Sequence, residues 1–481
     1  MRDLFDTSII LPKLWLARIP KYWDETIPTD IPKSSSSFSY VSTEAEKEAV
    51  KEMEENISDP EKSIITPEAL GEHNALGSYA GTYDVVADAG VRTLLSPNKL
   101  TNAIGALAYH YDDEADEWTQ IEDVELDKDG YVWGSCEEFS PIAVFGIRRD
   151  SYVDESQSLY KFPVFVCNGI FTKFYKNDED KIVAEDGYGK ITEIAENYLI
   201  LGGTYDGTDV ESTNISVVGI NIGKIIGGSA FLDHPVHVGT VNMNIKDTKS
   251  TSAITGVGVG CRVEKVNMTI DGCESNGLGC TESYYQNKCL NKTLEDSHLR
   301  LGAPQWTKEG VINVTNSKIQ VAYASASNGY SYVKDAKMYA DNCEFEWLCC
   351  GQSNGTVDNA YLVISNSKVK YFNTANRGYC GDAKSIVKGC EIENAYILGD
   401  LDELTNRELA KPEGKVYVDY DANCKIDNLC VGCVGEPGNG HVVETYEEAV
   451  QLISAVKISR DAQVTYAEGT EATLGDLLAI K

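Results

Sequence analysis

The sequence predicts a mainly β fold: a parallel β-helix preceded by an extended amino-terminal arm, short helices and a small antiparallel β domain. Three observations lead to this prediction. A pattern of apolar residues returns about every 24 residues between positions 238 and 426, as expected of a repeat architecture. Within each copy, apolar and polar residues alternate, as they do in strands. Each copy also carries Asn, Asp or Gly at one fixed place, where a backbone can turn.

The copies of the repeat follow one internal order, some in full and others in shortened form. A valine comes first, and apolar residues follow at alternate positions. Next come Asn, Asp or Gly, then a small Ser, Thr or Cys that we call the anchor, and finally an apolar residue two positions later. The anchors are Thr248, Cys273, Ser317, Cys343, Ser367, Cys390 and Cys424, with a weaker copy expected near Ser297 and a first copy near Gly223.

A unit of this length is too short for a domain but suits one coil of a parallel β-helix. A single coil cannot bury its apolar row, so neighbouring coils must stack to supply the core. Equivalent positions then form columns, and the anchors form a column of Ser, Thr and Cys. We expect residues 158–435 to form this β-helix, with residues 158–203 covering its open end.

The anchor column explains much of the cysteine content. Fourteen cysteines in 481 residues are too few for a disulfide scaffold, and no four have the paired spacing of a zinc site. We interpret four of them as small buried apolar residues in one column. These four are Cys273, Cys343, Cys390 and Cys424. A metal or redox role stays open for two pairs, Cys349 with Cys350 and Cys430 with Cys433.

Composition limits the function classes. The formal net charge of −33 argues against a nucleic-acid partner, because phosphates would be repelled. No run approaches the ~18 apolar residues of a membrane span, so we expect no membrane association. The first residues carry Asp3 and Asp6 and do not read as a secretory signal peptide. We expect no cofactor and no metal site.

The amino-terminal residues differ from the repeats. We expect residues 1–60 to form an extended arm and a charged helix, since the arm carries Pro12, Pro20, Pro28 and Pro32. A flexible serine linker at residues 34–37 should join the arm to the helix. Thr43 and Glu46 make a capping box at the start of that helix.

Two similar segments follow within residues 61–103. Thr66-Pro67-Glu68-Ala69-Leu70 is echoed by Ser96-Pro97-Asn98-Lys99-Leu100. In each, a Ser or Thr cap precedes a proline at the first helical position, so we expect two short helices. They are either related copies or two ordinary capped helices.

Two further segments complete the chain. Residues 104–150 alternate apolar and polar residues around Asp-rich turns, which predicts a small antiparallel β domain. Residues 436–481 should close the far end of the β-helix. There a helix over residues 445–456, opened by Thr445, should precede a short β tail.

Three resemblances add to this interpretation. The Thr-Pro-x-x-Leu and Ser-Pro-x-x-Leu openings resemble short helices of bacteriophage fibre and baseplate proteins. The coils resemble the right-handed parallel β-helix of phage tailspikes and pectin-lyase-like proteins. The segment that ends in Phe139-Ser140-Pro141-Ile142 resembles β-sandwich pieces of Gram-positive surface proteins.

The phage resemblance implies a structural virion protein of the head or tail, a fibre, spike or capsid decoration. The amino-terminal arm would bind other virion proteins, and the protein would form a homotrimer. Its β-helix would be exposed, for example for host adhesion, and the protein would leave the cell by lysis. The main alternative is a bacterial surface or extracellular binding protein. A polysaccharide depolymerase is the third.

Candidate site residues are few. Glu344, Glu346, Glu391 and Glu393 should lie on neighbouring coils and face outward, as catalytic carboxylates of a glycosidase would. The same alternation is typical of a solvent-facing row, so we assign no catalytic residue and predict no enzyme. Among the six histidines only His234 and His237 lie close in sequence, and no triad emerges.

One aromatic pair is a candidate glycan site. Trp347 and Tyr371 stand four residues past their anchors in successive coils. Stacked aromatic rings could form a platform for a host-surface glycan. Alternatively they line the core, since they share parity with Phe345 and Val369, or they form a subunit interface.

Overall fold

The computed structural model describes most of the chain. The described residues are 37–39, 44–58, 64–137, 141–156, 160–231, 234–281, 305–325, 331–351, 356–374, 379–398, 414–431, 451–467, 470–471 and 478–480. The chain divides into two units, Met1–Asp150 and Ser151–Lys481, and both consist mainly of strands. The arm at residues 1–36, together with Thr43, Ser297 and Cys433, lies outside the described residues.

The first unit is built from two antiparallel sheets. The larger has the order β1-β2-β8-β4-β5 and the smaller β3-β7-β6. Their strands are β1 Ser37–Ser39, β2 Asn74–Val86, β3 Thr93–Leu94, β4 Gly105–Asp112, β5 Glu117–Gln120, β6 Val124–Leu126, β7 Val132–Gly134 and β8 Ile142–Arg149. Helix α2 (Glu44–Ser58) buries Met53 in a cluster with Phe145 and Leu107 on the larger sheet.

The first short helix is confirmed and the second prediction is wrong. Helix α3 (Pro67–Leu70) is capped by Thr66, whose hydroxyl accepts the N–H of Ala69. Residues 97–100 form only a bend. There the Ser96 hydroxyl accepts the N–H of Asn98 in a local turn (3.0 Å), and the Asn98 amide donates to the Tyr83 hydroxyl (2.8 Å). Such side-chain bonds compete with helix formation.

The antiparallel sheet begins earlier in the chain than predicted. Strands β1 and β2 both precede residue 104 and belong to the larger sheet. Ser37, expected in a flexible linker, pairs with Val86 in β1.

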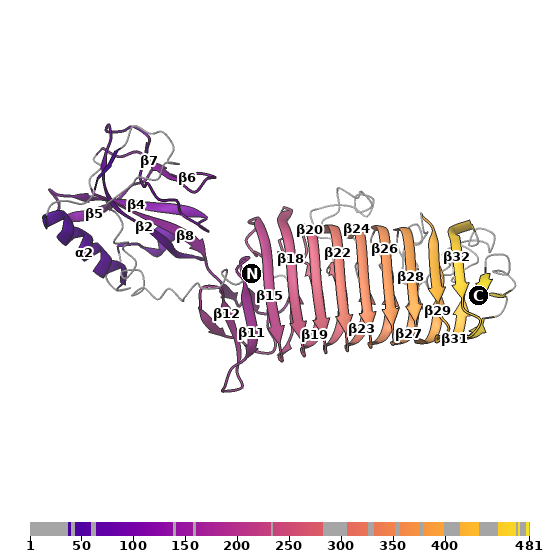
Figure 1. The fold of residues 1–481 in the computed structure, drawn as a ribbon. Helices are drawn as coiled ribbons and strands as arrows, with labels where there is room; N and C mark the ends of the chain where they lie inside the picture. The colour runs from indigo at the N-terminus through magenta and orange to yellow at the C-terminus, as the bar shows by residue number, and fades with distance from the viewer. Residues whose placement is uncertain are drawn as a thin grey trace. The chain divides into compact units, whose positions relative to one another are not determined.

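The second unit consists of two long sheets, which we call sheet 1 and sheet 2 (Figure 1). Sheet 1 contains β9 Tyr152–Asp154, β10 Val164–Val166, β14 Leu199–Leu201, β16 Asn221–Ile222, β17 Lys224–Ile226, β19 Lys249–Val257, β21 Glu274–Thr281, β23 Lys318–Tyr323, β25 Glu344–Cys349, β27 Lys368–Asn373, β29 Glu391–Tyr396, β31 Lys425–Cys430 and β33 Gln463–Tyr466. Sheet 2 contains β11 Thr172–Lys176, β12 Ile182–Asp186, β13 Ile191–Glu193, β15 Val210–Val218, β18 Val236–Lys246, β20 Cys261–Asp271, β22 Gln305–Thr315, β24 Ser331–Asp341, β26 Thr356–Ser365, β28 Tyr379–Lys388, β30 Val416–Tyr420, β32 Ile453–Ile458 and β34 Leu478–Ile480.

From β18 onward the chain alternates between the two sheets, and each strand pairs in parallel with the strand two places later. Successive coils therefore stack, and their core residues form columns. One column runs through Met243, Met268, Ile312, Met338 and Leu362. These side chains belong to one apolar cluster that spans the stack. At the start of the unit, β12 and β13 add to the end of sheet 2 in antiparallel fashion, as expected for a cap over residues 158–203.

A two-residue turn joins each of the sheet 2 strands β18, β20, β22, β24, β26 and β28 to the next strand of sheet 1. Its first residue has a left-handed backbone, with φ of 52° at Asn316 and 51° at Asn366, which explains the Asn, Asp or Gly of the repeat. Its second residue is the anchor. The Ser367 hydroxyl accepts the N–H of Cys343 in the preceding coil (3.0 Å) and donates to the carbonyl of Ser365 (2.6 Å).

Thiols take the same place in the coils anchored by Cys273, Cys343, Cys390 and Cys424. The Cys343 thiol donates to the carbonyl of Asp341 (3.2 Å) and accepts the N–H of Ser317. Each anchor thus satisfies a backbone group of the coil before it. That requirement explains why only small side chains with a polar hydrogen occur in the column.

Two predictions for the second unit are wrong. No coil is anchored near Ser297, because β20 pairs directly with β22, and β21 with β23. The helix expected over residues 445–456 ends earlier than predicted. Residues 445–450 lie outside the described residues and residues 451–452 are helical, but residues 453–456 lie in β32, where Ile453 and Val456 are buried beside β30. Parallel pairing of an apolar row prevails there over local helix propensity. Strands β33 and β34 confirm the β tail.

Candidate functional site

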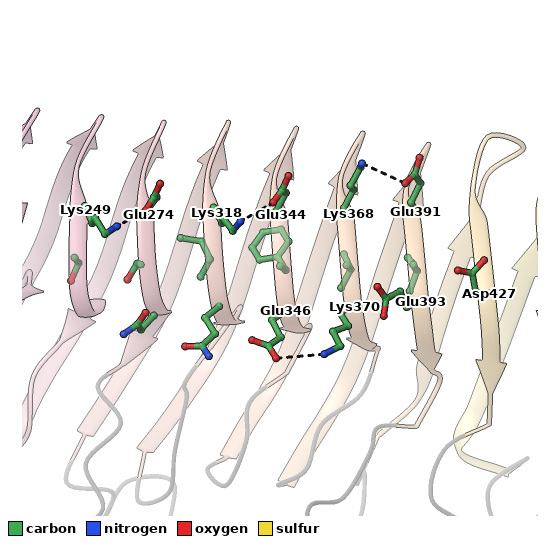
Figure 2. A pocket seen from close by; sticks show the side chains of 18 of the residues that line it. Lys249, Glu274, Lys318, Glu344, Glu346, Lys368, Lys370, Glu391, Glu393 and Asp427 are labelled. Carbon is green, nitrogen blue, oxygen red and sulfur yellow. Dashed lines mark ion pairs between the residues drawn. The ribbon is translucent and has the colours of Figure 1, made fainter.

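Lysine and glutamate alternate along the outer face of sheet 1. In each coil the residue after the anchor begins a strand of this sheet, and the parallel register places these residues side by side. The column, which we call the charge ladder, is Lys249, Glu274, Lys318, Glu344, Lys368, Glu391 and Lys425. The sign of the charge changes at every coil (Figure 2).

Ion pairs join successive members of the ladder two by two. The distance between Nζ and the nearer carboxylate oxygen is 2.9 Å for Lys249 and Glu274. It is 3.4 Å for Lys318 and Glu344, and 3.7 Å for Lys368 and Glu391. All six side chains are more than half exposed, so each pair contributes little to stability. The Lys249 ammonium nevertheless lowers the pKa of Glu274.

A second row of polar side chains runs beside the ladder. It contains Asn276, Gln320, Glu346, Lys370, Glu393 and Asp427. Together the two rows line a groove of about 830 Å³ that crosses seven strands, from β19 to β31. Five lysines and six carboxylates line it, whereas the whole chain carries 42 basic and 75 acidic residues. The groove is therefore close to neutral on a strongly acidic protein.

The four candidate carboxylates lie on two strands that are not adjacent in sheet 1. Glu344 and Glu346 lie on β25, and Glu391 and Glu393 on β29, so the prediction of neighbouring coils is wrong. Strand β27 lies between them. Its Lys368 pairs with Glu391, and its Lys370 with Glu346 at 3.8 Å (Figure 2).

The aromatic pair is brought together as predicted. The rings of Trp347 and Tyr371 stack with centroids 4.2 Å apart and planes 24° from parallel. Each ring covers one face of the other, and the Lys370 ammonium lies over Tyr371, 5.1 Å from its centroid. A sugar platform needs free ring faces, and this arrangement covers faces of both rings.

The two rings do not line the core. Both are half-buried, whereas Phe345, Leu348 and Phe372 are buried. The parity argument is wrong because the strand bends at Glu346: the partly exposed Trp347 follows the partly exposed Glu346 directly, and the ladder register skips that position.

The anchor cysteines are buried and unbridged, as expected. Burial raises the pKa of Cys390 to about 11 and that of Cys424 to about 12. Cys349 and Cys350 are also buried free thiols, and burial raises the pKa of Cys350 to about 12. Raised thiol pKa values disfavour the reactive thiolate. The His234 ring lies beside that of Phe231, with centroids 4.9 Å apart and planes tilted by 58°, and no group of three or more potential metal ligands occurs among the described residues.

The charge ladder escaped sequence analysis, although its signal was present. Reading only the residue after each anchor gives Lys, Glu, Lys, Glu, Lys, Glu and Lys in chain order. Sheet 2 also holds a contact between side chains of neighbouring coils. The Lys384 ammonium lies between the rings of Tyr361 and Tyr417, 5.8 Å and 5.2 Å from their centroids. Both features join residues from different coils, so a local sequence window misses them.

Comparison of the chain with protein-family models, with curated proteins and with solved structures found no match. Within the described part of the chain, no helix is long and apolar enough to cross a membrane.

Proposed function

We propose that this protein is a structural component of a bacteriophage virion, a fibre or spike whose second unit is a right-handed parallel β-helix exposed on the particle. The first unit and the arm before it would bind other virion proteins, and the protein would assemble as a homotrimer. The proposal rests on the resemblance of the coils to tailspikes and on the properties of the coil stack itself.

The observation that carries the proposal is the way in which each coil satisfies its neighbours. The anchor of one coil accepts a backbone N–H of the coil before it, as Ser367 does for Cys343. Ion pairs such as Lys318 with Glu344 join coils on the outside. A stack stabilised along its whole length suits a rigid rod that must hold its shape outside the cell.

Two observations weigh against the depolymerase. The candidate carboxylates on β25 and β29 are separated by the lysines of β27. The rings of Trp347 and Tyr371 cover one face of each other, and the Lys370 ammonium lies over Tyr371. The phage resemblance itself now rests on one short capped helix, α3, and on the coils, because residues 97–100 form no helix.

The test is mass spectrometry of purified phage particles from the source, combined with immunogold labelling by an antibody against residues 240–400. We expect peptides of this chain in the particle fraction and label on the head or the tail. Peptides confined to the bacterial envelope fraction would instead favour the surface-binding alternative. Cleavage of a polysaccharide by the purified protein would favour the depolymerase.

A further inference from the structure

We propose that the groove of sheet 1 binds a linear polymer that carries positive and negative groups in alternation, such as a zwitterionic polysaccharide. This inference rests on the proposed function, since it names the ligand class that an exposed β-helix of this kind would recognise. Three properties of the groove carry it: the alternation of its charges, their spacing, and the weakness of the internal pairs.

The alternation selects against polymers of a single charge. A polyanion laid along the ladder would meet Lys318 and Lys368 favourably but would be repelled by Glu344 between them. A polycation would be attracted by Glu344 but repelled by the lysines on either side of it. Only a polymer whose own charges alternate can oppose every member of the ladder with the opposite sign.

The spacing matches that of an extended sugar chain. Neighbouring strands of a sheet lie about 4.8 Å apart, so like charges on the ladder recur every ~9.6 Å. Two β-linked sugars of an extended polysaccharide span a similar length. A disaccharide repeat with one ammonium and one carboxylate would therefore remain in register over several coils. The neighbouring polar row, with Asn276 and Gln320, offers hydrogen-bond partners for sugar hydroxyls.

The internal ion pairs leave the charges available to a ligand. The pairs lengthen along the groove, from 2.9 Å at Lys249 to 3.7 Å at Lys368. The Lys318 side chain is 72% exposed and that of Lys368 is 68% exposed. Exposed pairs of this kind contribute little to stability, so their exchange for contacts with a ligand has a small energetic cost.

The alternation follows a repeat of two coils rather than one. Through Glu391, every hydroxyl anchor precedes a lysine and every thiol anchor precedes a glutamate, as Ser367-Lys368 and Cys390-Glu391 illustrate. The pattern thus distinguishes neighbouring coils that are otherwise alike. Such regularity suits a periodic ligand.

The experiment compares three β-linked oligosaccharides of about eight sugars, long enough to span the ~29 Å ladder. The probes are N-deacetylated hyaluronan, which is zwitterionic, hyaluronan itself, which is anionic, and a chitosan oligomer, which is cationic. Binding to the full chain is measured by calorimetry at about pH 5.5, where glutamates are ionised. We expect the zwitterionic probe to bind at least about tenfold more tightly than either of the others. We also expect added salt to weaken the binding of this probe.

Two charge-swapped variants complete the test. Lys318→Glu with Glu344→Lys keeps the net charge and the internal pair but breaks the alternation, and should weaken binding of the zwitterionic probe about fivefold. Glu264→Lys with Lys308→Glu swaps an ion pair on sheet 2 (2.9 Å) whose side chains are also more than half exposed, and should leave binding unchanged. Equal binding of all three probes, binding of none, or an unchanged affinity in the first variant would overturn the inference. These outcomes are independent of whether the protein is found on virions.

Discussion

Substitution of Ser367 by alanine tests the way in which coils are joined. Ser367 is 2% exposed, and its hydroxyl is the acceptor for the backbone N–H of Cys343. Alanine would leave that buried N–H without its acceptor, and the carbonyl of Ser365 would lose a donor. A buried polar group left unsatisfied costs about 1–3 kcal/mol, so we expect the free energy of unfolding to fall by that amount.

Ser367→Cys is the matched control. A thiol already occupies the equivalent place at Cys343 and Cys390, where it both donates and accepts, so this variant should lose less than about 1 kcal/mol. Thr269→Ala, on the exposed face of sheet 2, controls for loss of a hydroxyl alone. The assay is urea unfolding followed by circular dichroism. Unfolding free energies are compared between variants for which the slope of free energy against urea concentration is the same. Equal losses for Ser367→Ala and Ser367→Cys would refute the role given to the anchor hydrogen bond.

Three further predictions follow from single sites. Hydrogen bonds from Ser365 and Asn366 lower the pKa of Asp341 below its usual 3.8. This carboxylate therefore stabilises the fold above pH 3.8, and its contribution is lost as the pH falls through the lowered pKa. Ser365→Ala should reduce the acid dependence of the urea midpoint, and an unchanged pH profile would contradict this. Cys350 is fully buried, and burial raises its pKa to about 12. It should resist maleimide labelling at about pH 8 in the folded protein and react once the protein is unfolded, as peptide mass spectrometry can show. Rapid labelling of the native protein would show that the coil opens. Trp347→Ala should lower stability by about 0.5–1.5 kcal/mol beyond the loss of buried area, because the stack with Tyr371 is removed; urea unfolding measures this, and an unchanged midpoint would show that the stack does not stabilise the fold.

The sequence predicted the coils because their signal is local. Alternation at Met268 and Ile270 reflects one strand, and the left-handed turn at Asn366 needs a residue type that tolerates positive φ. The anchor column followed from the same reasoning. Its hydrogen bonds, such as that from Cys343 to Ser367, required only that equivalent positions stack.

The failures depended on contacts distant in sequence. Whether residues near Ser297 formed a coil was decided by direct pairing of β21 with β23, which no local pattern records. The parity of Trp347 was reversed by a bend at Glu346. The charge ladder joins residues one coil apart, so each lysine and glutamate alone resembles an ordinary exposed residue.

The two turns of each coil differ in whether they can accept inserted residues. From sheet 2 to sheet 1 the chain turns in two residues after each of the strands β18 to β28, and one extra residue there would move every later side chain of the strand to the wrong face. From sheet 1 to sheet 2 the connection ranges from residues 258–260 to residues 282–304, yet the strands on either side keep their register. Because the entropic cost of closing a loop rises slowly with its length, this edge can accept foreign peptides while the opposite edge stays constant. The protein is therefore a natural display scaffold, in which new surfaces can evolve or be engineered along one edge without redesign of the core.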